Sequence, residues 1–383
     1  MLSAHIWIKR TSSSDGPGGR SVRILYVEPL GVRGGMGHYN EALITAYEQA
    51  GASLEVVTSS HDPSYAFRAD VHVSRFFRLA LDRSKPRVLR AMGYVGGYLG
   101  CLRLARRSDV AVLHILHRPA ADRLALKAFR RLGCRLVLVA HDPEPVLASQ
   151  RGSAYQGCLR LFDLVVVHGP KARADVIAQG APDGKVVVAR HGDFRATLPL
   201  ASAAASRALG LPNLVRPTAA IIGNLRPGKG IRRARQALEV VPSPVRTLLI
   251  AGSKQGDWDL QDAARTSEKS RLQVVRVDRR MSDLEELAAY SLADVLLALY
   301  DSGYSSGVIA RAHSMGKPVV LTNVGDLALQ AHTDDVVVAA DYTAAELREA
   351  IERCLRASTE APTDWDREPW LYHARSVMAR ISE

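Results

Sequence analysis

Short apolar runs alternate with helical patterns along the first half of the chain. Residues 22–27 form the first run, residues 38–50 follow with apolar side chains at helical spacing, and residues 54–58 form a second run. This order predicts a strand, a helix and a second strand parallel to the first, joined by a right-handed crossover. The pattern continues with strands expected at 110–115, 135–140, 164–167 and 186–189, and with helices at 120–132 and 171–179.

A second series of the same kind occupies the rest of the chain. Many of its runs are apolar throughout and rich in β-branched residues, which is typical of strands buried on both faces of a parallel sheet. The pattern therefore predicts the α/β fold class with two doubly wound units. Ligands bind such sheets at the carboxyl ends of the strands, so we expect the site in the cleft between the units. Strands are expected at 219–222, 247–251, 272–275, 295–299, 318–321 and 336–338, and helices at 283–292, 306–315 and 346–358.

The 383 residues suit two domains of ordinary size. Residues 1–20 are rich in Ser and Gly and lack the long apolar core of a secretory signal, so we expect a disordered leader outside the fold. The N-terminal domain is expected at 21–196 and the C-terminal domain at 197–365. Residues 199–217 are rich in Ala, Ser and Pro and are expected to connect the two. A last helix, at 366–383, is expected to pack back on the first domain.

Composition narrows the class of protein. No run of about 18 or more apolar residues occurs, so no transmembrane helix is expected. The four cysteines form no C-x-x-C pair, which favours buried free thiols in a reducing cytoplasm over a zinc site or disulfides. We therefore expect no bound metal and a cytoplasmic protein.

The net charge of +12 is unevenly distributed, with ten Lys and Arg residues against two Asp between residues 68 and 107. Such a region suits an anionic membrane, a nucleic acid or a phosphorylated substrate, and it also suits a merely solvated helix surface. No nucleic-acid-binding motif accompanies the charge, so we do not expect a nucleic-acid partner. A peripheral position on the inner face of the plasma membrane remains one of the open interpretations.

Two glycine-rich loops follow predicted strands. Gly35 and Gly37 lie between the first strand and the first helix, where backbone amides can approach an anion. The alternative is a flexible turn. Arg226 and Lys229 lie three residues apart in the loop 223–230, ahead of a helix expected near Ile231. A planar guanidinium group and a point charge together suit a diphosphate. The alternative is a pair of solvated surface cations.

A third strand end leads into the segment 300–308. Ser305 or Ser306 is placed to cap the following helix, and the amides of Gly307 and Val308 would then point outward towards an anion. An ordinary capped helix is the alternative. Tyr304, within the same segment, is a further candidate for the site.

Histidines end three of the predicted strands, at His141, His168 and His191. His141 has the richest surroundings, because Asp142 adjoins it and two prolines constrain the loop that follows. We expect His141 to act at the reacting centre, with His191 and Asp142 as further candidates. A lone histidine is more often structural, so each of the three also has that interpretation.

Taken in order, these motifs resemble the retaining glycosyltransferases of family 4, which have the GT-B fold of two Rossmann-like domains around a cleft. The resemblance covers almost all of the chain after residue 20. It is carried by the glycine loop and helix at 34–39 and by the segments 50–56, 180–192, 223–230, 293–295 and 316–320.

The resemblance implies roles for particular residues. Gly35 and Gly37 would approach the donor phosphate or the acceptor, and His141 would lie near the transferred sugar. Arg226 and Lys229 would hold the diphosphate, helped by the amides of Ser306, Gly307 and Val308. The family usually needs no metal ion, because cationic side chains and helix ends neutralise the leaving diphosphate. The co-substrate would be a nucleoside-diphosphate sugar, with no other cofactor.

One departure from the family concerns a pair of glutamates that commonly contacts the donor. The chain has Gly303 and Arg311 at these positions, and the stretch 305–308 resembles a subgroup that also lacks the pair. We expect transfer of a hexose-type sugar to a glycan, lipid-linked or small-molecule acceptor, in polysaccharide or glycoconjugate biosynthesis. The alternatives are a sugar-nucleotide 2-epimerase of the same architecture and a catalytically inactive scaffold partner.

Overall fold

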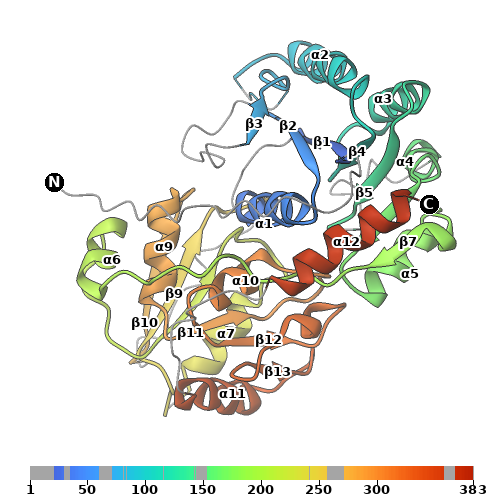
Figure 1. Cartoon of the computed structure of the whole chain (residues 1–383). Helices are drawn as coiled ribbons and strands as arrows, with labels where there is room; N and C mark the ends of the chain where they lie inside the picture. The colour runs from blue at the N-terminus through green and yellow to red at the C-terminus, as the bar shows by residue number, and fades with distance from the viewer. Residues whose placement is uncertain are drawn as a thin grey trace, which may run out of the picture.

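The computed structural model describes residues 21–29, 35–59, 71–80, 82, 84–114, 116–141, 143, 153–240, 242–256, 271–357 and 367–382. The expected leader at 1–20 and Asp142 lie outside these residues. Within them the chain forms two parallel sheets with helices on their faces (Figure 1). The predicted α/β class with two units is therefore confirmed.

The first sheet contains seven strands in the order β3-β2-β1-β4-β5-β6-β7, every pair of which is parallel. The helices of this half are α1 (Gly35–Gln49), α2 (Arg87–Ala105), α3 (Pro119–Arg131), α4 (Ser153–Leu159) and α5 (Pro170–Ala178). The strands are β1 (Arg23–Glu28), β2 (Ser53–Thr58), β3 (His72–Ser74), β4 (Val110–Leu113), β5 (Arg135–Val139), β6 (Leu164–Val167) and β7 (Val186–Val188).

The second sheet contains six strands in the order β10-β9-β8-β11-β12-β13, again parallel. Its helices are α6 (Ser202–Leu209), α7 (Ile231–Leu238), α9 (Asp283–Leu292), α10 (Gly307–His313), the short 3-10 helix η3 (Leu327–Gln330) and α11 (Ala344–Arg356). The strands are β8 (Thr218–Ile222), β9 (Thr247–Gly252), β10 (Gln273–Asp278), β11 (Val295–Ala298), β12 (Val319–Thr322) and β13 (Val336–Val338).

Burial on both faces explains why the strands are apolar throughout. In β1, Leu25 and Val27 belong to one core cluster, while Ile24 and Tyr26 belong to another on the opposite face. Strand β8 repeats this division between two further clusters. Successive side chains of a strand point to opposite faces, so a sheet covered by helices on both sides needs apolar residues at every position.

Local signals determine where several helices begin. Ser282 and Glu285 form a capping box at the start of α9, and Thr343 and Glu346 form one at the start of α11. Each box satisfies backbone amides that have no partner within the helix. These two helices begin within two residues of the predicted positions.

Besides the short helix α4 and the 3-10 helices, three elements were not predicted from the sequence. Strand β3 is short, and α2 contains four glycines that break its helical pattern. Cβ atoms at Gly97 and Gly100 would clash with Phe77 and Phe76, so these glycines let the preceding segment pack directly on the helix. The third element, α6, lies within the expected connection at 199–217 and packs against α9.

The C-terminal helix, α12 (Glu368–Ser382), returns to the first half of the chain. It packs against α1 and β6, with Trp370 fully buried (Figure 1, red). The four cysteines are buried and unpaired, as expected. No helix in the described part of the chain is long and apolar enough to cross a membrane.

Candidate functional site

The two halves contact each other at the carboxyl ends of their strands. Asp326 follows β12, and its carboxylate accepts hydrogen bonds from the amides of Lys171 (2.9 Å) and Ala172 (2.8 Å) at the start of α5. A Cβ atom at Gly169 would lie 2.2 Å from Asp326, so the glycine permits this approach. Tyr304 donates its hydroxyl proton to Asp175 at 2.7 Å, from the second half to α5.

The loop 223–230 is shaped by glycines in the left-handed region. Gly228 and Gly230 have φ values of +84° and +69°, and a Cβ atom at Gly230 would lie 2.4 Å from the Leu299 carbonyl oxygen. The loop therefore lies directly against the end of β11. It leads into α7, which begins at Ile231 as predicted.

The two cations of this loop are placed differently. Lys229 is only 8% exposed, and its ammonium nitrogen lies 3.7 Å from the centroid of the Tyr300 ring. A cation over an aromatic face at this distance is electrostatically stabilised. Arg226 is exposed to solvent. The Lys229 side chain is thus held in place by burial and by Tyr300, whereas the exposed Arg226 side chain can move to contact a ligand.

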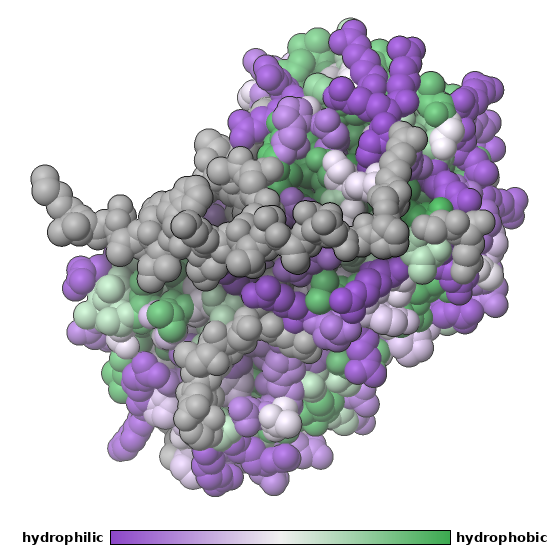
Figure 2. All heavy atoms as spheres, viewed as in Figure 1, coloured by the Kyte–Doolittle hydropathy of each residue, from purple (hydrophilic) through white to green (hydrophobic). Residues whose placement is uncertain are grey.

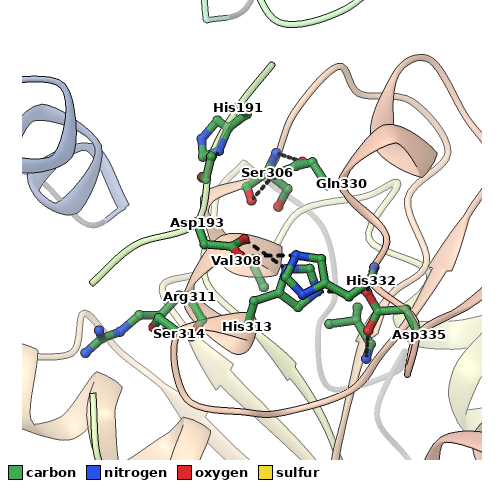
Figure 3. Close-up of polar contacts among 12 residues, drawn as sticks. His191, Asp193, Ser306, Val308, Arg311, His313, Ser314, Gln330, His332 and Asp335 are labelled. Atoms are coloured by element: carbon green, nitrogen blue, oxygen red, sulfur yellow. Dashed lines mark hydrogen bonds and ion pairs between the residues drawn. The ribbon is translucent and has the colours of Figure 1, made fainter. Parts of the chain in front are cut away.

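Tyr300, which contacts Lys229 through its ring, also contacts the start of α10 through its hydroxyl group. Its hydroxyl group lies 3.1 Å from Ser306 Oγ, and Ser306 is the N-cap residue of α10 without a side-chain capping bond. The prediction that Ser306 caps the helix through its hydroxyl group is therefore wrong. The Gln330 side chain instead accepts from the Ser306 amide at 2.7 Å and donates to the Ser306 carbonyl at 3.3 Å (Figure 3). Gly307 and Val308 form the first turn of α10.

His141 is the histidine that joins the two halves at this point. Its Nδ1 lies 3.2 Å from Ser305 Oγ, across the interface. Burial lowers the pKa of His141 to about 4, so the imidazole is neutral near pH 7. A neutral imidazole can donate or accept a hydrogen bond there without carrying charge.

The three strand-end histidines surround Tyr39 of α1. Their ring centroids lie 5.0 Å (His141), 5.6 Å (His168) and 5.3 Å (His191) from that of Tyr39. His168 is fully engaged, with Nε2 at 2.8 Å from the Tyr39 hydroxyl group and Nδ1 at 2.8 Å from the Ala189 carbonyl oxygen. This arrangement favours the structural interpretation for His168.

The two ring nitrogens of His191 differ in their partners. Its Nδ1 donates to the Gly192 carbonyl oxygen at 2.7 Å, while Nε2 is buried and has no hydrogen bond to any described residue. Burial, and the neighbouring His168 and His141, hold the pKa of His191 well below its usual value. Because Nδ1 carries the proton in this neutral ring, Nε2 offers a lone pair.

The glycine loop before α1 is described only in part. Gly35 begins α1 and Gly37 is buried in its first turn, while residues 30–34 lie outside the described part. The two glycines are carried by the same helix as Tyr39, next to the histidines. Tyr39, Tyr300 and Gln330 were not among the predicted site residues, although Tyr39 and Tyr300 lie within the predicted motifs at 34–39 and 300–308.

Among the described residues, one group has the composition of a metal site. Ligand atoms of Asp193, His313 and His332 all lie within 4.8 Å of one another. The two imidazole rings are stacked, however, with centroids 3.7 Å apart and planes inclined by 17°. Lone pairs of nearly parallel rings do not converge on one ion, as zinc coordination requires. The group serves better as an ion-pair cluster.

Comparisons with known proteins agree with this two-part architecture. Residues 33–192 match the family described as Glycosyltransferase Family 4, and residues 216–357 match the family described as Glycosyl transferases group 1. The chain belongs to the family 4 type of glycosyltransferases. No match was found among curated protein sequences.

Solved structures of other glycosyltransferases share the fold over nearly the whole chain. Sucrose-phosphate synthase from Thermosynechococcus elongatus is 17% identical, with a TM-score of 0.59 over 94% of each chain. Anabaena HepE in complex with UDP is 16% identical, with a TM-score of 0.60 over 94% of this chain and 100% of its own. The catalytic domain of starch synthase IV from Arabidopsis thaliana, bound to ADP and acarbose, is 12% identical, with a TM-score of 0.65 over 94% and 99%. The predicted GT-B fold is confirmed.

This glycosyltransferase uses both positions of the missing glutamates for packing. Arg311 is buried, and its guanidinium group donates to Thr197 Oγ1 at 3.0 Å in the segment that links the halves. A Cβ atom at Gly325 would lie 1.8 Å from the Gly303 carbonyl oxygen, so the backbones of these two glycines approach closely. Neither position offers a carboxylate to a donor sugar.

Proposed function

We propose that this glycosyltransferase moves a hexose-type sugar from a nucleoside diphosphate to a glycan, lipid-linked or small-molecule acceptor, in polysaccharide or glycoconjugate biosynthesis. The observation that carries the proposal is the chain of contacts from Lys229 through Tyr300 to Ser306, next to the contact of Ser305 with His141. It brings a buried cation and a neutral histidine to one interface between the halves. The complexes of HepE with UDP and of starch synthase IV with ADP support a nucleotide ligand of this kind.

In this proposal the diphosphate lies between the loop 223–230 and the start of α10. Arg226 and Lys229 supply positive charge, and the α10 contacts fall to Gly307 and Val308 because Gln330 already bonds the Ser306 amide. These groups replace a metal ion in neutralising the leaving group. Gly35 and Gly37 would approach the donor or the acceptor from α1.

His141 would orient the transferred sugar through hydrogen bonds, since its pKa is held too low for it to act as an acid near pH 7. The leaving diphosphate would accept the proton of the attacking hydroxyl group. We propose retention of the anomeric configuration, as in the family that the chain resembles. His191, Asp142 and Tyr304 would support the same centre.

Isothermal titration calorimetry with UDP, GDP and ADP tests the donor site directly. We expect one of the three to bind, and its binding to weaken in the Lys229→Ala variant. Arg232→Ala is the matched control, because Arg232 is an exposed cation on the first turn of α7. If none of the nucleotides binds the wild-type protein, the donor-site proposal fails.

A catalytically inactive scaffold is the second candidate, and Gly303 and Arg311 favour it because both glutamate positions lack a carboxylate. Hydrolysis or transfer of the sugar from the bound nucleotide would exclude it.

A sugar-nucleotide 2-epimerase would change the sugar without any acceptor, so an acceptor-free assay of the donor separates it from a transferase.

We also propose that the protein binds an anionic membrane surface from the cytoplasm, through residues 68–107. Helix α2 contains no Asp or Glu, and Val88, Met92, Val95 and Leu99 form an exposed apolar stripe along one face. Arg103 and Arg106 continue that face by helical spacing. Figure 2 shows hydrophobic and strongly hydrophilic side chains next to one another at the top of the view, where Figure 1 places α2 and α3. Apolar side chains flanked by arginines suit a surface of anionic lipids near a lipid-linked acceptor.

A further inference from the structure

Asp193, just after β7, is held from both halves of the molecule. Its carboxylate oxygens lie 3.1 Å from His313 Nδ1 and 3.1 Å from His332 Nε2, both in the second half (Figure 3). Its carbonyl oxygen accepts a hydrogen bond of 2.6 Å from Trp370 Nε1 on α12. The position of this backbone segment is therefore determined by contacts with the second half of the molecule and with α12.

His313 carries a positive charge in this arrangement. Its second ring nitrogen, Nε2, lies 2.8 Å from Asp335 Oδ2, so each nitrogen faces a carboxylate oxygen. Carboxylates only accept hydrogen bonds when ionised, so both ring nitrogens must carry protons. The two carboxylates raise the pKa of His313 to about 9 against the opposing effect of burial. His332 stacks on the ring, and Arg311 is the other nearby charge on α10.

Asp335 is itself fixed, which makes the ion pair rigid. Its carboxylate accepts hydrogen bonds of 2.7 Å from the amides of Val319 and His332. The side chains of His313 and Asp335 are 3% and 1% exposed. Charged hydrogen bonds in such a shielded place are stronger than those on the surface.

His191 lies two residues before Asp193, at the proposed reacting centre. Its ring centroid is 5.4 Å from that of His141 and 5.1 Å from that of Trp370. A Cβ atom at Gly192 would lie 2.5 Å from Trp370 Nε1, so the segment has no room to shift towards α12. The lone pair of His191 Nε2 is buried and has no partner in the part of the chain that the structure describes, so a donor group of a ligand could bond to it.

We propose that Asp193 and His313 are a positioning pair that holds His191 so that its Nε2 accepts a hydrogen bond from a hydroxyl group of the bound sugar or acceptor. The proposal rests on the transferase function argued above. The ion pair acts only through the backbone of residues 191–193 and touches no substrate. His332 contributes less, because its side chain is half exposed.

The first experiment follows the titration of His313 by NMR in protein labelled at histidine, with His313→Gln used to assign the signal. We expect the pKa of His313 to lie near 9 and to fall by at least about one unit in Asp193→Asn, because an opposite charge at this distance raises a histidine pKa by roughly one to three units. A value near 6.5 in the wild type would overturn the ion pair. So would zinc that remains bound after dialysis and is lost in His313→Gln. Neither result depends on sugar transfer.

The second experiment measures turnover against pH with the nucleotide sugar that calorimetry identifies. In Asp193→Asn we expect kcat to fall about tenfold with the donor KM within about threefold, since a charge-assisted contact is lost away from the diphosphate. The alkaline limb of the profile should move to lower pH together with the pKa of His313. His332→Gln, which removes only the exposed partner, should leave that limb in place. An unmoved limb in Asp193→Asn, with a lower melting temperature alone, would show a structural role and overturn the proposal.

Discussion

The Lys229 ammonium nitrogen lies 3.7 Å from the centroid of the Tyr300 ring, although 71 positions separate the two residues in the chain. The contact follows from the strand order, because β8 precedes the loop of Lys229, β11 precedes Tyr300, and the two strands are parallel neighbours. Their carboxyl ends therefore release both loops at the same edge of the sheet. A phosphate bound at this edge would meet both loops at once.

Removal of either cation of the loop 223–230 should weaken turnover. We expect Arg226→Ala and Lys229→Ala each to lower kcat/KM by at least about tenfold, because a lost charge-assisted phosphate contact costs roughly 1.5–3 kcal/mol. Steady-state kinetics with the nucleotide sugar would measure this, with Arg232→Ala as the control for a general loss of positive charge. Unchanged kinetics in both variants would remove the donor-site assignment.

The residues at the strand ends of this site could be predicted from the sequence. The side chains that contact them from distant parts of the chain could not. Apolar runs of four to six residues mark where β5, β6 and β7 stop, so His141, His168 and His191 could be placed at one edge. Gln330 is hydrogen-bonded to Ser306 although 24 positions separate them in the chain, and no local sequence pattern predicts such a contact. Helix α2 was not predicted because glycines interrupt its apolar spacing. These glycines are required by the close packing of Phe76 and Phe77 against the helix, which the sequence does not show.

Asp326, from the second half of the molecule, caps the start of α5, and this contact should contribute to the stability of the protein. In Asp326→Ala the amides of Lys171 and Ala172 lose their acceptor, and loss of an N-cap typically costs about 0.5–2 kcal/mol. We expect a lower melting temperature, and a smaller loss in Asp326→Asn, which keeps one acceptor oxygen. Calorimetric unfolding of the three proteins would measure the order. Equal melting temperatures would mean that water replaces the cap without cost.

Acid should destabilise the protein at an unusually high pH. Burial lowers the pKa of His38 and His141 to about 4 and that of His114 to about 3, whereas these groups titrate near 6.5 in the unfolded chain. Stability is therefore lost as the pH falls below 6.5, by up to about 1.4 kcal/mol per pH unit for each histidine that stays neutral. His313 does not share this loss, because its pKa is raised and its stabilising effect disappears only as the pH rises through about 9.

His114, directly after β4, offers the sharpest test of this acid sensitivity, since both of its ring nitrogens are buried and neither has a partner among the described residues. We expect His114→Leu, which is close in volume, to reduce the fall in melting temperature between pH 7.5 and pH 5. The exposed His72 makes His72→Gln the control, with an unchanged fall. The same fall in all three proteins would show that other groups govern acid unfolding.

Membrane binding should depend on the exposed face of α2 rather than on charge alone. Met92 and Leu99 are 63% and 61% exposed. Burial of such a side chain in a bilayer makes the free energy of membrane binding more favourable by roughly 1.5–3 kcal/mol. We expect Met92→Gln with Leu99→Gln to weaken sedimentation with phosphatidylglycerol vesicles at least about tenfold at low salt. Leu124→Gln is the matched control, because Leu124 is 72% exposed on α3 and lies off the stripe. If the wild-type protein ignores these vesicles, or if the double variant binds them as well as the control does, then α2 is only a solvated surface.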